Sequence, residues 1–161
     1  MSEHRVGIGY DTHRFSAVRT LKLGGVEIPG MPGLHGFSDS DVLAHAVIDA
    51  VLGAAALGDI GRHFPDTDPQ YEGADSIELL REAVARVARE GWRVVNVDAT
   101  VICEEPQLAP LAAAMGKRLG GALGVGPEQV SVKGTTNEGM GFVGRGEGIA
   151  AIAVAQIERD A

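Results

Sequence analysis

The sequence predicts an α+β domain in which helices pack on one face of a mixed β-sheet. Two observations carry this prediction. Apolar residues alternate with a strand-like period at residues 5–10, 94–103, 130–134 and 149–157, and helical apolar stretches lie between these segments. The chain has 161 residues, which suffices for one domain with a sizeable core but is short for two. We therefore treat residues 1–161 as a single compact domain.

Composition restricts the possible partners. The formal net charge is -8, whereas binding to nucleic acid or to an anionic membrane needs clustered Lys and Arg. The N-terminal residues lack the basic and apolar regions of a signal peptide, and no apolar run approaches membrane-spanning length. Cys103 is the only cysteine, so an intrachain disulfide is impossible. We expect a cytoplasmic protein with no nucleic-acid and no membrane partner.

The first strand, at residues 5–10, runs directly into Asp11-Thr12-His13. If the backbone stays extended there, Asp11 and His13 point to the same side. Residues 21–28 predict a hairpin that turns at Gly24-Gly25. A loop rich in proline and glycine follows at residues 30–37.

A long apolar helix is expected next, over residues 38–58. Ser38 and Asp41 have the spacing of a capping box, and Gly58 suits the helix end. Asp41, His45 and Asp49 are four residues apart and therefore share one helix face. Burying these groups is costly unless they are paired, hydrogen-bonded or bound to a metal.

The remaining elements alternate irregularly. A polar loop at 59–73 precedes an amphipathic helix that begins at the Asp75/Glu78 capping pair and ends at Gly91. After the strand at 94–103, a third helix is expected to start at Glu104-Glu105-Pro106. A glycine-rich connection at 135–148 separates the last two strands. The final strand is apolar on both sides, so we expect it to be central in the sheet or buried at a subunit contact.

Asp11, His13 and His45 form the leading candidate site. Two imidazoles and a carboxylate suit zinc in a site that keeps a fourth position open for water or substrate. An Asp-x-His pair alone is more often a surface pair or a hydrogen-bonded histidine. His45 favours the metal, because it lies in an apolar helix and needs a partner. Asp41 or Asp49 would orient it.

Two loops offer further chemistry. After the strand at 130–134, threonine hydroxyls, glycine amides and Arg145 suit phosphate, and Glu138 offers an oxygen ligand for magnesium or manganese. In the loop at 59–73, aspartates could accept hydrogen bonds from sugar hydroxyls, although a solvated turn is the commoner role of such residues. We expect three histidines at the surface and the cysteine in the core or near the site; these are His4, His35, His63 and Cys103.

Six motifs in order resemble the family of 2-C-methyl-D-erythritol 2,4-cyclodiphosphate synthases. They are Asp11-Thr-His13, Ser38-Asp-Ser-Asp-Val-Leu-Ala-His45, Gly53-Ala-Ala-Ala-Leu-Gly-Asp-Ile-Gly61, Phe64-Pro-Asp-Thr-Asp-Pro69, Ala74-Asp-Ser76 and Gly141-Phe-Val-Gly-Arg-Gly-Glu-Gly148. The resemblance extends from Arg5 to about Ile157. It implies a homotrimer with active sites at subunit interfaces and a cytidine-diphosphate substrate.

The resemblance also implies roles for residues. Zinc would be held by Asp11, His13 and His45, and magnesium or manganese by Glu138 on the nucleotide diphosphate. Thr136 would stabilise the transition state, acting with Glu138. The implied substrate contacts are Asp11, Thr12, His13, Phe37, Ser38, Asp59, Ile60, Gly61, Phe64, Pro65, Asp66, Thr67, Asp68, Cys103, Glu104, Glu105, Pro106, Gln107, Leu108, Ala109, Thr135, Thr136, Asn137, Glu138, Phe142 and Arg145.

The implied reaction is an intramolecular phosphoryl transfer. The 2-phosphate of 4-diphosphocytidyl-2-C-methyl-D-erythritol 2-phosphate attacks the β-phosphorus, expels CMP and closes a cyclic diphosphate. Phe37 stands where family members usually have histidine, and Gln107 replaces a commonly basic residue; we expect neither departure to abolish activity. Two other functions remain open on the residues alone. One is a zinc-dependent phosphohydrolase, and the other is a trimeric small-molecule-binding module with a structural metal.

Overall fold

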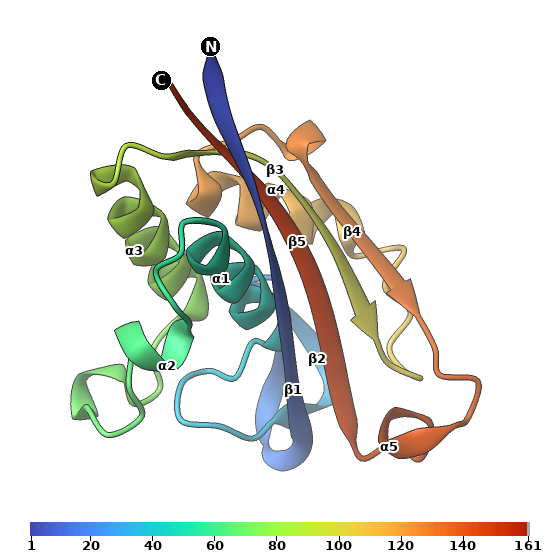
Figure 1. The fold of residues 1–161 in the computed structure, drawn as a ribbon. Coiled ribbons are helices and arrows are strands. Elements are labelled where there is room, and N and C mark those ends of the chain that lie inside the picture. Colours follow the sequence, from blue (N-terminus) through green and yellow to red (C-terminus); the bar gives the residue numbers. More distant parts are fainter. Residues whose placement is uncertain (161) are drawn as a thin grey trace.

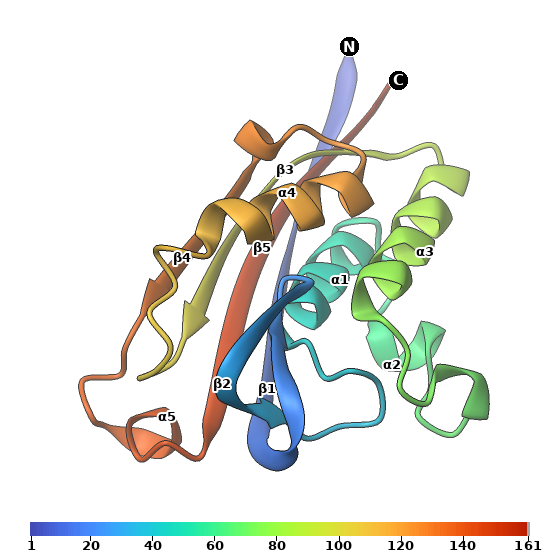
Figure 2. The ribbon, with the colours of Figure 1, turned by 180° about the vertical axis from the view of Figure 1, so that it is seen from behind.

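The computed structural model describes residues 1–160 and shows one five-stranded sheet with the order β2-β1-β5-β3-β4. Strands β1 and β5, β5 and β3, and β1 and β2 pair antiparallel, whereas β3 and β4 pair parallel. The three long helices lie on one face of this sheet (Figures 1 and 2). The predicted fold class, a mixed sheet with helices on one face, is confirmed.

The elements have the following bounds. The strands are β1 (Ser2–Leu23), β2 (Val26–Leu34), β3 (Arg93–Ile102), β4 (Val130–Thr135) and β5 (Gly148–Asp160). The helices are α1 (Val42–Ala54), α2 (Ile60–His63), α3 (Ser76–Arg89), α4 (Ala112–Leu123) and α5 (Gly141–Gly144), with short 3-10 turns at Pro69–Tyr71 and Pro127–Gln129. The predicted hairpin turn at Gly24-Gly25 is present, and both glycines have positive φ, as a tight two-residue turn requires.

Helix α1 packs directly on β1 because two glycines of the strand allow a close approach. A side-chain carbon added at Gly7 would overlap the carbonyl oxygen of Ala50, and one added at Gly9 would overlap that of Ala46. Glycine is the residue that permits such backbone contact. The helix is buried on nearly all sides, as its composition predicts. This packing carries His45 to the segment of β1 that holds Asp11 and His13.

The predicted limits of α1 are wrong at both ends. Asp41, not Ser38, caps the helix, and its carboxylate accepts hydrogen bonds from the amides of Ala44 at 3.0 Å, Gly24 at 2.9 Å and Gly25 at 2.7 Å. The helix ends at Ala54, before Gly58, because Ala56 already has a positive φ of 59°. The capping-box spacing was misleading since the hydroxyl of Ser38 faces His45 instead.

The predicted start of the third helix is also wrong. Residues 104–111 form a loop, and α4 begins at Ala112. Pro106 and Pro110 explain the delay, because proline lacks a backbone donor and disfavours helical geometry in the residue before it. The apolar spacing of this segment also predicts that Leu108, Leu111, Met115 and Leu119 point inward. Leu108, Met115 and Leu119 are buried, and Leu111 is partly buried against the core.

Strand β5 is central in the sheet, as one of the two expectations for it stated. Its inner residues are buried under the helices, while Ile152 and Val154 on the outer face are each 39% exposed. Beside them on β1, Val6, Ile8 and Tyr10 are 67%, 69% and 53% exposed. The outer face of β1 and β5 thus presents a contiguous row of large apolar side chains to solvent. We call these five residues the outer apolar face.

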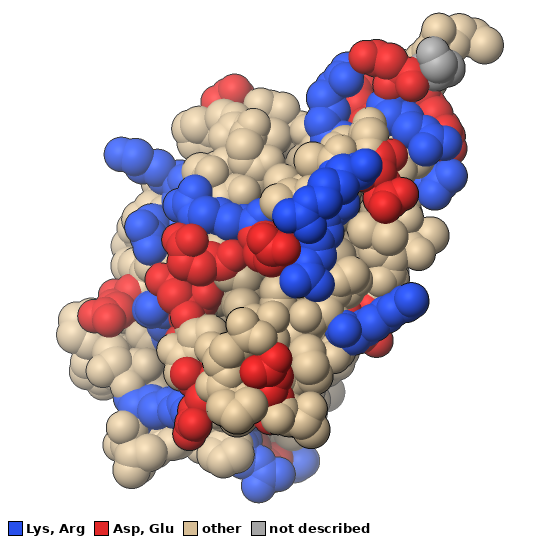
Figure 3. Space-filling model, turned by 90° about the vertical axis from the view of Figure 1, so that its left-hand side faces the viewer, with Lys and Arg blue, Asp and Glu red and all other residues tan. Residues whose placement is uncertain are grey.

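Charges are mixed on the side of the molecule that carries α3 (Figure 3). Basic and acidic side chains alternate there, and the pairs include Arg81 with Glu78 at 3.1 Å and Arg86 with Glu82 at 2.9 Å. Among residues 1–160, none of the helices combines the length and apolar character needed to cross a membrane.

Candidate active site

Asp11, His13 and His45 converge at the contact between β1 and α1. Asp11 Oδ2 lies 2.9 Å from His13 Nε2 and 3.1 Å from His45 Nδ1, and the two nitrogens are 3.3 Å apart. Tetrahedral zinc with ligands at about 2.0–2.1 Å requires ligand atoms about 3.3 Å from one another. Three atoms of the right chemical types therefore already sit close to the corners of such a site, which fits a divalent metal ion.

The hydrogen bonds of the two histidines leave one nitrogen of each ring directed to the site. His13 Nδ1 lies 2.7 Å from the carbonyl oxygen of His35, which can only accept, so this nitrogen carries the proton. Nε2 of His13 is then free as a ligand. His45 has the opposite arrangement, since its Nδ1 faces the site and its Nε2 lies 3.1 Å from Ser38 Oγ and 2.8 Å from Ser76 Oγ.

The electrostatics of the site favour an ionised carboxylate. Burial would raise the pKa of Asp11, but the hydrogen bonds and positive charges that His13 and His45 supply when their rings are protonated outweigh burial and lower that pKa to about 2. For His13, burial would lower the pKa, but the hydrogen bond and charge of Asp11 outweigh it and the pKa is raised. Asp11 is consequently ionised at neutral pH, the form that can bind a metal ion.

Asp41 and Asp49 do not orient His45, contrary to the sequence-based expectation. Asp41 binds the three amides described above, and Asp49 accepts a hydrogen bond from the amide of Ile60 at 2.7 Å. Spacing along one helix could not reveal that each carboxylate is used by another segment. The groups that contact His45 Nε2 instead are Ser38 and Ser76. The sequence analysis missed the role of Ser76, at the start of α3, and the only signal for it was its place in the Ala74-Asp-Ser76 motif.

A cavity of about 400 Å³ opens beside the three ligands. It brings together many of the residues expected at the substrate site, namely Asp11, His13, Phe37, Ser38, His45, Ile60, Gly61, Phe64 and Asp66. Tyr71 and Leu79 also line it and were not anticipated. We call this cavity the metal pocket. Asp59 and Asp68 lie in the same segment, where their carboxylates cap α2 and the turn at Pro69–Tyr71.

A second cavity, of about 590 Å³, lies near the β4 edge of the sheet, between the loop that follows β3 and strand β4. Its lining includes Cys103, Glu104, Pro106, Gln107, Leu108, Ala109, Thr135 and Thr136. We call it the β3/β4 pocket. Glu104 accepts hydrogen bonds from the amides of Asn137 at 3.1 Å and Gly139 at 3.2 Å, so it shapes the loop that carries Glu138. The two pockets have no lining residue in common.

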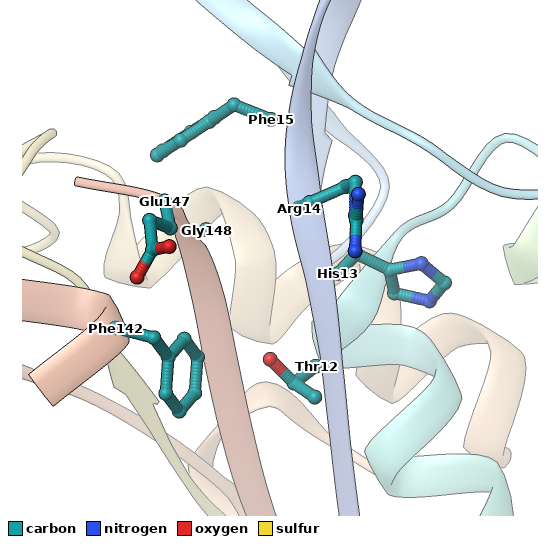
Figure 4. Close-up of a pocket in the computed structure, with 7 residues that line it drawn as sticks. All are labelled: Thr12, His13, Arg14, Phe15, Phe142, Glu147 and Gly148. Atoms are coloured by element: carbon teal, nitrogen blue, oxygen red, sulfur yellow. The ribbon is translucent and has the colours of Figure 1, made fainter. Parts of the chain in front are cut away.

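Other expected residues lie apart from both pockets. Thr12 points to the opposite side of β1 from His13, toward Phe142 (Figure 4), and its hydroxyl donates to the carbonyl of Ile149 at 3.1 Å. Arg145 pairs with Glu147 at 2.8 Å and lines a separate cavity that Glu105 also borders. Pro65 and Thr67 lie in the loop after α2, and Glu138 is exposed with a positive φ of 53°.

The remaining histidines and the cysteine mostly follow expectation. His4 and His35 are exposed, and Cys103 is buried and lines the β3/β4 pocket. His63 is only half-buried, and its ring bonds both Leu57 O and Arg86 Nη1, so it holds α2 against α3.

Fold and site together define a single-domain α+β protein with a two-histidine, one-aspartate cluster able to hold a metal ion, and with a second pocket lined by polar and apolar residues. The chain belongs to the YgbB family, whose model matches residues 4–158.

Similar proteins carry a consistent name. The chain is 60% identical to 2-C-methyl-D-erythritol 2,4-cyclodiphosphate synthase of Dechloromonas aromatica, over 96% of this chain and 97% of that protein. It is also 60% identical to a bifunctional IspD/IspF enzyme of Anaeromyxobacter dehalogenans, of which it spans only 40%. A CDP-bound structure of a 2C-methyl-D-erythritol-2,4-cyclodiphosphate synthase superposes with a TM-score of 0.85 and 34% identity, over 94% of this chain and 98% of that one.

Proposed function

We propose that this protein converts 4-diphosphocytidyl-2-C-methyl-D-erythritol 2-phosphate to 2-C-methyl-D-erythritol 2,4-cyclodiphosphate and CMP, in the non-mevalonate route to isoprenoid precursors. It would be classed as a phosphorus-oxygen lyase. Relatives of nearly equal length that carry this enzyme name support the proposal. The CDP-bound structure of a similar protein supports a cytidine nucleotide as the ligand.

The metal site fits zinc. Asp11, His13 and His45 supply one charged oxygen and two neutral nitrogens, the donor set of an open zinc site. A zinc ion held there would polarise a phosphate oxygen and offset its charge. We assign magnesium or manganese, on the nucleotide diphosphate, to the exposed carboxylate of Glu138. The chain itself is acidic, so bound cations would offset much of the charge of the substrate.

The protein's own contribution is mainly alignment. The attacking group is a phosphate, which is already ionised at neutral pH, so phosphoryl transfer needs positioning and charge neutralisation more than a base. The hydroxyls of Thr135 and Thr136, at the end of β4, are available to phosphate oxygens beside the β3/β4 pocket. That pocket would hold the cytosine, with Cys103 at its wall, while the metal pocket would hold the methylerythritol phosphate.

One observation carries the assembly proposal: the two pockets that the reaction needs are separate within one chain. Strand β5 lies between β1, which carries the metal ligands, and β3, which leads to the nucleotide residues. A homotrimer in which the metal pocket of one subunit meets the β3/β4 pocket of its neighbour would complete each site. The outer apolar face supports this assembly, since such a patch on a small domain is typical of an interface.

Mixed trimers test the composite site. His45→Ala removes a metal ligand and Thr136→Ala removes the nucleotide-side hydroxyl, so each homotrimer should be nearly inactive. The two variants are then refolded together in equal amounts. A site in a mixed trimer is intact when a Thr136→Ala subunit supplies its metal pocket and a His45→Ala subunit supplies its β3/β4 pocket. Random assembly makes about a quarter of sites intact, so about a quarter of wild-type activity should return. If each site lay within one chain, mixing would restore nothing.

Product analysis separates the reaction from its rivals. Phosphorus NMR of the reaction mixture should show a cyclic diphosphate together with CMP, whereas a phosphohydrolase would leave a linear phosphate. His45→Ala should remain a folded oligomer that binds little zinc. If His45→Ala fails to fold while the zinc-free wild type is folded, the His45 side chain has a structural role instead. If the wild type also unfolds without zinc, the metal is structural.

A further inference from the structure

A chain of hydrogen bonds runs from His45 away from the metal pocket into the protein. His45 Nε2 lies 2.8 Å from Ser76 Oγ. The Ser76 hydroxyl donates to Asp39 Oδ1, and the backbone amide of Ser76 donates to Asp39 Oδ2 at 3.0 Å. Lys22 Nζ lies 3.4 Å from that same oxygen. Ser76 is fully buried, so the contacts of its hydroxyl with His45 and Asp39 are shielded from water.

The direction of each bond in this chain follows from its end. The Asp39 carboxylate can only accept, so the single proton of the Ser76 hydroxyl goes to Asp39. The Ser76 oxygen then has only lone pairs to offer His45. His45 Nε2 must therefore carry a proton and donate it. In the neutral ring this leaves Nδ1 with its lone pair directed to the metal pocket, 3.1 Å from Asp11 Oδ2.

We propose that Asp39, acting through the hydroxyl of Ser76, holds His45 in the tautomer and ring orientation needed to bind a metal through Nδ1. Neither residue touches the metal pocket's ligand atoms, so both are positioning residues. This inference rests on the metal site of the proposed function. It assigns to Asp39 and Ser76 the role of orienting His45, which the spacing along α1 had wrongly indicated for Asp41 or Asp49.

The contact of Ser38 with His45 does not replace the hydrogen bonds that run from His45 through Ser76 to Asp39. Its oxygen lies 3.1 Å from His45 Nε2 and also accepts the amide of Ser40 at 3.2 Å. The hydroxyl proton of Ser38 is committed to neither of those bonds. Without Ser76, Ser38 could either accept from Nε2 or donate to it, so both tautomers of His45 would become accessible. The carboxylate of Asp39 removes this ambiguity.

Two substitutions test the chain, with a matched control. Ser76→Ala removes the hydroxyl that accepts the hydrogen bond from His45 Nε2. Asp39→Asn keeps the shape of the side chain but supplies an amide that can donate to the Ser76 oxygen. The Ser76 hydroxyl is then free to donate to His45 Nε2. Ser40→Ala is the control, because Ser40 is also fully buried in the same region but its hydroxyl contacts Arg19, at 3.1 Å, rather than His45. Thermal unfolding of all variants reports any general loss of packing.

Two measurements are made on each variant. Nitrogen NMR of metal-free protein with labelled histidine, at a pH where the ring is neutral, assigns the tautomer of His45. Competition with a chromophoric chelator gives the zinc affinity. We expect a single Nε2–H tautomer in the wild type and in Ser40→Ala, and a mixture or the reverse tautomer in Ser76→Ala and Asp39→Asn. Zinc affinity of the latter two should fall by about 10- to 100-fold, as loss of such supporting hydrogen bonds typically causes.

The results distinguish this inference from the proposed metal site. If zinc binds the wild type but Ser76→Ala and Asp39→Asn bind it equally well, the positioning role is wrong and the metal site stands. If zinc affinity falls while His45 keeps its tautomer and orientation, the residues act through packing and the inference is also wrong. If the wild type binds no zinc, the metal site fails, and the tautomer measurement still decides whether Asp39 and Ser76 control His45.

Discussion

Substitution of Gly9 by alanine should disrupt the contact between β1 and α1, which brings the three candidate metal residues together. Gly9 lies on β1 under α1, and its position places the backbone of α1 against the strand. A Cβ built there overlaps the carbonyl oxygen of Ala46 and lies 2.8 Å from the backbone nitrogen of Ala50. The obstructing atoms belong to a buried helix backbone, so no side-chain rotation can relieve the overlap.

The size of the effect follows from the clearance. Ordinary contact begins at 3.4 Å, so α1 must withdraw by at least about 0.6 Å at Ala50 and by more at Ala46, which adjoins His45. Overpacking of this kind costs about 1–3 kcal/mol, and a backbone obstacle favours the upper end, about 3 kcal/mol. Metal ligands tolerate displacements of only about 0.2 Å, so zinc affinity should fall at least about tenfold.

Urea unfolding and zinc competition measure the two effects. Gly53→Ala is the control, because Gly53 lies on the same helix and a Cβ there meets only the carbonyl oxygen of Ile8, at 3.9 Å. That variant should be neutral or more stable by about 0.5–1 kcal/mol, since alanine is the better helix former. A Gly9→Ala protein that matched Gly53→Ala in both stability and zinc affinity would refute the argument that this glycine allows the helix and strand to meet.

Three further predictions concern other contacts. Asp41→Ala should lower the free energy of unfolding in urea by about 3 kcal/mol, because it leaves three amides without their acceptor. Asp75→Ala, which removes an ordinary helix cap, should lower it by about 1 kcal/mol. Equal losses of stability in the two variants would contradict this prediction. Burial, with the charge of Glu104, raises the pKa of Cys103 to about 11, against about 8.5 for an ordinary thiol, so a thiol reagent at pH 8 should label native protein at least about 100-fold more slowly than protein in urea; similar rates would exclude a raised pKa. Phe37→His should change turnover by less than about tenfold in a steady-state assay, because Phe37 lines the metal pocket but is not among the three metal-site residues; a gain of orders of magnitude would show that the native residue impairs catalysis.

Much of the fold followed from local patterns. Each predicted strand overlaps an observed one, although β1 extends over Ser2–Leu23 rather than residues 5–10. The Gly24-Gly25 hairpin and α3, with Asp75 at its start, appear where turn residues and periodicity indicated. Such features depend on residues close in sequence, so they can be predicted without tertiary information. The start of α4, by contrast, was not predicted correctly. Apolar spacing continued back to Leu108, and only the observed loop shows that Leu108 enters the core without being helical.

The candidate metal residues were also accessible from the sequence, for two different reasons. Asp11 and His13 share a side of β1 because alternate strand residues do so, which is a local property. His45 stood out because an imidazole in an apolar helix needs a partner. Their convergence, however, required α1 to contact β1 through Gly7 and Gly9, and no local pattern specified that approach.

Residue types and their spacing were therefore sufficient to indicate the order of the main strands and long helices, the mixed sheet and the three candidate ligands, but not the limits of α1 and α4 or the short helices α2 and α5. The partners of the buried polar groups were decided only by the packed chain. Asp41 binds Gly24 and Gly25 from a hairpin, while His45 is held by Ser76 from α3. The physical reason is that a hydrogen bond depends on distance in space, and residues distant in sequence become neighbours only when the helices and the sheet have packed.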